Sequence, residues 1–118
     1  MPLPWVRLDT SMPDNPKILR MAMTPAGKAA AFVWVCSLSY SGKHGTDGFI
    51  PPEALVRING TRADAAKLVE AGLWDRDPAT GGWMVHGWDE FQMSTEETQK
   101  RSDRARLAAL KRWGKAPP

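Results

Sequence analysis

The middle third of the chain alternates short apolar segments with residues that force turns, and this order constrains the fold most. An extended stretch, Thr46–Pro51, precedes a helical pattern over Pro52–Ile58. Asn59-Gly60 then predicts a tight turn, because both residue types tolerate positive φ. A second helical pattern follows over Arg62–Ala71. Two helices joined by so short a turn must lie close together in the fold.

The second of these helices has end signals on both sides. Thr61 is a favoured N-cap, and Gly72 suits the left-handed position after a helix. Two short strand patterns and the turn-rich loop between them come next: Leu73–Asp75, Arg76–Gly82 and Trp83–His86. Strand, helix, turn, helix, strand, loop and strand is the chain order of a winged helix-turn-helix with a small β-hairpin wing.

The N-terminal third supplies the elements that would cover this motif. Trp5–Asp9 alternates apolar and polar residues, which indicates a short strand or an extended segment. Asn15-Pro16 begins a short helix. Thr24-Pro25 begins a longer helix to about Tyr40, ended by Ser41-Gly42. Because that helix is apolar on nearly all sides, we expect it to be central and buried. The expected fold class is α+β, mainly α.

The C-terminal end has a different composition. Ser94-Thr95-Glu96-Glu97 is a capping box that predicts a helix to about Trp113. Residues 1–97 hold nine Lys/Arg and twelve Asp/Glu, whereas residues 98–118 hold seven Lys/Arg and one acid. We therefore divide the chain into a winged helix-turn-helix domain, 1–93, and a basic C-terminal helix with a short tail, 94–118. A basic arm of this kind favours binding to nucleic acid, with a solvated, solubilising helix as the alternative.

Within the motif, a few cations and one hydroxyl are placed to meet DNA. Arg62 at the start of the second helix suits guanine, because its fork matches that base edge, and Thr61 precedes it. Lys67 would reach phosphate, as would Arg57 before the turn and Arg76 at the wing. The acids of the same helix, Asp64 and Glu70, count against this interpretation and leave a mixed, solvated helix face as the alternative.

The C-terminal cations are the stronger electrostatic feature. They are spread around the expected helix, so that several phosphates could be contacted at once. The set consists of Lys100, Arg101, Arg104, Arg106, Lys111, Arg112 and Lys115. Leu107, Leu110 and Trp113 form a thin apolar stripe that could dock on the domain or on a second copy. The stripe is too short and its surroundings too Ala-rich for a coiled coil.

Other classes of protein find little support. The chain has 118 residues, 42% of them hydrophobic, which suits one domain with a real core. The single cysteine, Cys36, is expected to be a small buried hydrophobe. No signal peptide and no membrane span is visible, so we expect a cytoplasmic protein. His44 and His86 have no metal-ligand spacing, and no residues converge on a reaction, so we expect no enzyme, metal or cofactor.

Two smaller expectations concern acidic and aromatic residues. The adjacent pair Asp89-Glu90 indicates a turn. The tryptophans Trp74, Trp83 and Trp88 are more typical of core and hairpin packing than of a platform for stacking bases.

Several stretches also resemble a family of actinobacteriophage and prophage proteins whose winged helix is similar to the N-terminal domain of phage replisome organisers, the primosomal replication initiators. The matching pieces are Trp5–Asp9, Asn15-Pro16-Lys17, Thr46–Pro51, Ala71–Trp74, Val85–Trp88 and the basic run ending in Arg112-Trp113. The resemblance implies a winged-helix fold, no catalytic residues and a role in DNA replication initiation or transcription regulation in a bacterial host cell.

Two hypotheses follow. The first is a phage-type DNA-binding protein whose C-terminal helix supplies the phosphate contacts. The alternative is a protein-interaction module, either self-associating as a homodimer or scaffold, or binding a host or phage replication protein. The acidic balance of residues 1–97 motivates the second hypothesis.

Overall fold

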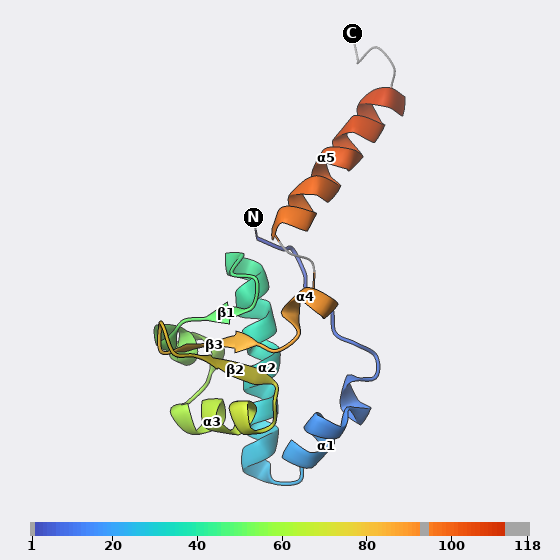
Figure 1. The fold of residues 1–118 in the computed structure, drawn as a ribbon. Coiled ribbons are helices and arrows are strands. Elements are labelled where there is room, and N and C mark those ends of the chain that lie inside the picture. Colours follow the sequence, from blue (N-terminus) through green and yellow to red (C-terminus); the bar gives the residue numbers. More distant parts are fainter. Residues whose placement is uncertain (1, 93–94, 113–118) are drawn as a thin grey trace.

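The computed structural model describes residues 2–92 and 95–112, with side chains in the last helix at 100, 101 and 103–112. The fold is α+β and mainly helical, with one small antiparallel sheet (Figure 1). Its elements are η1 (Met12–Asp14), α1 (Pro16–Met21), α2 (Pro25–His44), β1 (Phe49–Ile50), η2 (Pro52–Ile58), α3 (Arg62–Glu70), β2 (Trp74–Asp77), β3 (Gly82–Val85), α4 (Trp88–Phe91) and α5 (Thr95–Arg112).

The sheet has the strand order β1-β3-β2, so the last strand of the hairpin lies in the middle. Trp83 of β3 pairs with Ile50 on one side and with Arg76 on the other. Both edges of β3 are thus paired, one with the neighbouring hairpin strand and one with a segment that precedes η2 and α3. The β2–β3 hairpin confirms the two strands expected after Gly72.

The core lies between α2, α3 and the sheet. Trp74, Ile50 and Leu68 are fully buried there, and the ring centroids of Trp74 and Trp83 lie 5.4 Å apart. The indole N–H of Trp74 donates a 3.2 Å hydrogen bond to Ser37 Oγ of α2, which satisfies a polar group that would be costly to bury alone. Trp88 is buried as well, so the expectation that these three tryptophans are core residues is confirmed.

The central helix is longer than expected: α2 runs to His44, and the prediction that Ser41-Gly42 ends it was wrong. Gly45 ends it in the left-handed conformation, with φ of 65°. Gly42 lies inside the helix, where the N-terminal segment packs so closely that a Cβ would lie 2.5 Å from Val6 Cγ1, so a glycine leaves the room that this contact requires. Ser41 is also used for packing, since its hydroxyl accepts a 2.6 Å hydrogen bond from Gly48 N.

α2 is central, as expected, because it packs against α1, β1, η2 and α3, but the expectation that it is buried holds for one face only. Val33 and Leu38 are buried, but Phe32 remains 58% exposed because no described element covers that side of the helix. Cys36 is half-buried, with Asn59 Nδ2 3.8 Å from its sulfur. α2 therefore packs through one face.

The segment Trp5–Asp9 is extended but belongs to no strand. The side-chain amide of Gln92 takes the place of a strand partner, because it bonds both backbone groups of Arg7. Arg7 N donates to Gln92 Oε1 at 2.7 Å, and Gln92 Nε2 donates to Arg7 O at 2.6 Å. This pair fastens the start of the chain to the end of α4.

Three further differences concern short elements. η2 is a 3-10 helix where the pattern predicted an ordinary helix. Asp89-Glu90 lies within the helix α4, so the prediction of a turn was wrong; Gly87, with φ of 73°, turns the chain just before it. Arg76, Asp77 and Gly82, expected in the hairpin loop, belong to the strands, whereas Leu73 and His86, expected in the strands, lie just outside them.

The C-terminal helix runs over Thr95–Arg112, as the sequence predicts to within a residue. Ser94 of the predicted capping box, the 93/94 domain boundary, Trp113 and Lys115 lie outside the described residues. Among the helices the structure describes, none is long and apolar enough to cross a membrane.

Candidate nucleic-acid interface

The position of α3 is fixed by hydrogen bonds at both of its ends. Thr61 and Asp64 form a capping box: Thr61 N donates to Asp64 Oδ2 at 2.9 Å, and Asp64 N donates to Thr61 Oγ1 at 3.2 Å. At the other end Gly72 has φ of 79°, and Leu73 N donates to Leu68 O at 2.9 Å. These bonds form a Schellman motif.

The capping box changes the interpretation of two candidate residues. The Thr61 hydroxyl, placed among the DNA contacts from sequence, is held by the cap and also bonds Asp64 Oδ2 at 2.9 Å. The Asp64 carboxylate, expected to repel phosphate, instead serves the helix terminus. The pattern Thr-x-x-Asp was visible in the sequence, where only Thr61 was assigned as a cap.

The inner face of α3 packs as its periodicity predicted. Ala65 and Leu68 are buried, and Val69 is half-buried at the edge of the core. The outer face presents Arg62 and Glu70, which are exposed. This arrangement leaves one charge of each sign on the surface that would have to face DNA.

A groove of about 420 Å³ separates α3 from the hairpin. Arg62 and Val69 line it from the helix, and Arg76, Asp77 and Trp83 line it from the strands. Both arginines are exposed. The fold therefore brings Arg62 and Arg76 to opposite walls of one groove, although fourteen residues separate them in the chain.

The other two cations of the motif lie elsewhere. Arg57 is exposed at the end of η2. Lys67 is half-buried on α3 and does not line the groove. It lies five residues after Arg62, and because an α-helix turns by about 100° per residue, the two side chains lie on different sides of the helix. Of these four predicted cations, only Arg62 and Arg76 therefore lie at the same groove.

The α5 helix carries the densest group of cations. Six basic side chains are exposed around it: Lys100, Arg101, Arg104, Arg106, Lys111 and Arg112. One of them, Arg106, places its Nη2 3.4 Å from Oδ1 of Asp103, which lies three residues earlier on the helix. Such a pair at the surface stabilises the helix only slightly.

The two candidate surfaces are separate. α5 leaves the body at the α4 end and projects away from it, whereas α3 lies at the other end (Figure 1). Arg57, Arg62 and Lys67 therefore do not form one continuous surface with the C-terminal cations. A straight duplex touching both would have to run along the length of the molecule.

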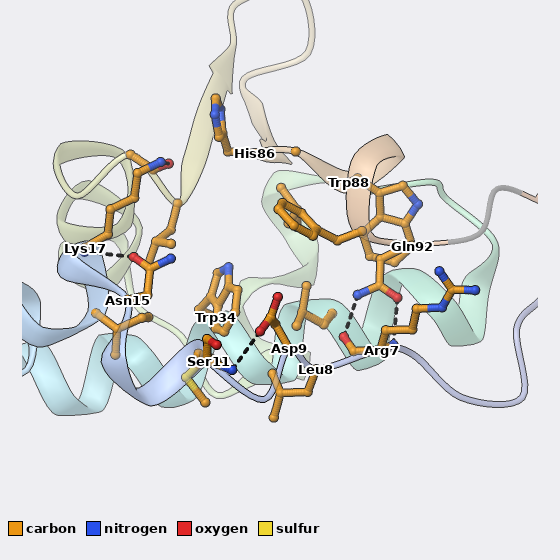
Figure 2. A pocket seen from close by; sticks show the side chains of 18 of the residues that line it. Arg7, Leu8, Asp9, Ser11, Asn15, Lys17, Trp34, His86, Trp88 and Gln92 are labelled. Atoms are coloured by element: carbon orange, nitrogen blue, oxygen red, sulfur yellow. Dashed lines mark hydrogen bonds between the residues drawn. The ribbon is translucent and has the colours of Figure 1, made fainter.

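Sequence reasoning missed a pocket of about 360 Å³ beneath the N-terminal segment. Figure 2 shows this segment arching from Arg7, which Gln92 holds, to Asn15, with Trp34 of α2 and Asp9 pointing into the space beneath it. Trp88 and Phe91 of α4 form the far wall. The sequence around Trp34 gave no sign of a pocket, because the segment that covers this indole, between Arg7 and Asn15, is remote from it in the chain.

The polar groups at the rim of this pocket are few. Lys17 Nζ donates to Gly72 O at 3.1 Å, and Asn15 Oδ1 accepts from Lys17 N at 2.8 Å. His86 Nδ1 lies 2.9 Å from Asp75 Oδ2, with both side chains more than half exposed. In the part of the chain that the structure describes, no cluster of three His, Cys, Asp or Glu side chains could hold a metal ion.

No family model, curated protein or solved structure matches this chain. The assignment of a function therefore depends on the chain's own geometry and charge.

Proposed function

We propose that residues 1–93 form a winged helix-turn-helix domain. The element order α2, β1, η2, α3, β2 and β3 supports this, because a helix pair joined by a tight turn is followed by a hairpin. The strand order β1-β3-β2 supports it further, since the strand before the helix pair joins the same sheet as the wing. Asn59, with φ of 61°, makes the tight turn.

The function that follows is DNA binding of the phage type, in replication initiation or transcription regulation. One observation carries it: α5 presents six exposed cations around a helix that projects from the body. Phosphate contacts from such a helix release counterions and supply affinity without reading sequence. The family resemblance supplies the phage setting.

The groove between α3 and the hairpin provides the second contact. Arg62 and Arg76 on its two walls are placed to bind the sugar-phosphate backbone from both sides. Because Glu70 lies on the outer face of α3, we expect this helix to orient the protein on DNA more than to read bases. α5 would then provide most of the affinity.

Fluorescence anisotropy with a labelled duplex and a labelled single strand tests the proposal. The full chain should bind at low salt, and the double variant Arg62→Ala/Arg76→Ala should bind several-fold more weakly. Lys28→Ala/Lys43→Ala is the matched control, since both lysines are exposed on α2 away from the groove. Absence of binding to both nucleic acids at low salt would contradict the proposal.

The second candidate is a protein-interaction module that binds a host or phage replication protein. The mixed outer face of α3 favours it, because Arg62 and Glu70 would suit a partner protein better than phosphate. A pull-down from nuclease-treated host lysate separates the two functions. Partners that survive nuclease, together with purified protein that ignores DNA, would favour this second function.

A further inference from the structure

The pocket beneath the N-terminal segment and the apolar stripe of α5 each leave apolar side chains open to solvent, although Trp88 in the pocket wall is itself buried. The pocket is walled by Trp34, Trp88 and Phe91, and Phe91 is 55% exposed at its rim. On α5, Leu107 is 65% exposed and Leu110 is 52% exposed. At a spacing of three residues these leucines lie on one face of the helix. Contiguous exposed apolar patches on a small protein often mark an interaction site, and the two leucines are neighbours on the helix surface.

The charges of the two regions are complementary. Residues 1–92 hold nine Lys/Arg and ten Asp/Glu, whereas residues 95–112 hold six Lys/Arg and three Asp/Glu. The body is therefore slightly acidic and the helix clearly basic, so that a helix of one copy is attracted to the body of another.

The charged residues that line the pocket are two carboxylates, Asp9 and Asp14, and two cations, Arg7 and Lys17, which differ in how they face it. Asp9 points inward, while the Arg7 side chain is directed away from the pocket (Figure 2). Asp9 Oδ1 accepts a 2.7 Å hydrogen bond from Ser11 N, and a carboxylate has room for further donors. The Lys17 ammonium is already bonded to a backbone carbonyl. A basic helix would therefore meet a carboxylate that can accept from it.

A helix cannot fill its own pocket in the geometry that the structure shows. α5 runs away from the body, and Leu107 lies twelve residues along it, about 18 Å from its start at 1.5 Å per residue. A second copy has no such restriction. Each copy has both a helix and a pocket. If the helix of each copy binds in the pocket of the other, both pockets are filled in a closed two-fold dimer.

We propose that α5 of one copy docks Leu107 and Leu110 into the pocket of a second copy, and that the second copy returns the same contact. On the helix, Arg104 and Lys111 flank the two leucines and would approach the Asp9 carboxylate of the other copy. Of the other four cations described on the helix, Arg101 and Arg112 lie on the face opposite the leucines and stay exposed to solvent, whereas Lys100 and Arg106 lie on the leucine side. In the dimer Arg101 and Arg112 therefore remain available to phosphate, while Arg104 and Lys111 are used by the contact between copies; the dimer itself does not depend on DNA.

Analytical ultracentrifugation of the full chain without nucleic acid tests the dimer. From about 5 µM to about 500 µM, a range typical of weak reversible association, the mass should rise from one copy to two. Leu107→Glu/Leu110→Glu should abolish this rise; neither side chain is buried in a single copy. Val56→Glu, at a position 79% exposed on η2, is the control and should leave it unchanged. A monomer throughout, or a dimer that survives the double variant, overturns the proposal.

Isotope-filtered NMR on a mixture of labelled and unlabelled copies tests the contact itself. Contacts between the Leu107 or Leu110 methyls and the Trp34 ring should appear between copies. If they appear only within one copy, the helix folds back on its own body and the proposal fails. Since DNA is absent from both experiments, failure of the DNA-binding proposal would leave these outcomes unchanged.

Discussion

The body of the protein and its C-terminal helix are held in place by different means. In the body, Trp74 and Leu68 are fully buried, and each end of α3 is fixed by hydrogen bonds. In α5 the described side chains are exposed, apart from the half-buried Asp103. The body is thus specified by contacts between distant residues, and α5 by its own sequence. Cations can be gathered on such a helix without disturbing the core.

The largest expected effect is on the body. Trp74→Ala should lower the free energy of unfolding by about 3–5 kcal/mol, because it opens a cavity and removes the N–H that Ser37 Oγ accepts from, while Ser37 Oγ still donates to Trp34 O. Trp5→Ala, at a position 58% exposed, is the control and should cost far less. In dilute protein Leu110→Ala should change stability by no more than about 0.5 kcal/mol. Urea unfolding followed by circular dichroism measures all three; a large effect of Leu110→Ala would show that α5 is part of the cooperative core.

A smaller effect is expected where the N-terminal segment is fastened. Gln92→Ala should lower the free energy of unfolding by about 1–2 kcal/mol, because both backbone groups of Arg7 lose their partner. It should also speed hydrogen exchange at the Arg7 amide. Phe91→Ala, next to it and 55% exposed, is the control. Unchanged exchange at Arg7 would mean that the segment is held by other contacts.

How far the sequence predicts this fold depends on whether a signal is local. Thr24, Thr61 and Gly72 act within one turn of their own helices, and their predicted roles are confirmed. The prediction that Gly42 ends its helix was wrong. The glycine is needed for close packing against Val6, which lies 36 residues earlier and gives no local signal. Local patterns therefore predict helix ends well and fail where tertiary packing decides.

The candidate site follows the same rule. The cations of α5 could be read from the sequence, since a local excess of charge needs no fold to be visible. That Arg62 and Arg76 face each other across a groove could not be predicted from the sequence, because it depends on how the hairpin packs against α3. The pocket over Trp34 was missed for the same reason: Arg7 and Gln92, which close it, are 85 residues apart.

The smallest stability effect is expected at the start of α3. Thr61→Ala should lower the free energy of unfolding by about 1 kcal/mol, because it removes the hydroxyl that accepts from Asp64 N. Thr61→Ser keeps the hydroxyl and should restore most of that stability. If α3 only orients the protein, both variants should bind DNA as the parent does at temperatures where they are folded. A binding defect in folded Thr61→Ala that Thr61→Ser restores would instead indicate a direct contact of the hydroxyl with DNA.

The salt dependence of DNA binding tests most directly whether α5 supplies the affinity. Arg104→Gln/Lys111→Gln/Arg112→Gln should reduce the slope of log K against log salt by about 2–3, close to 0.9 for each phosphate that is no longer neutralised. The matched triple variant Arg20→Gln/Lys28→Gln/Lys43→Gln removes the same charge from exposed positions on the body. We expect a reduced slope for the first variant and a nearly unchanged slope for the second. Equal reductions in both would mean that net charge, and not this helix, determines binding.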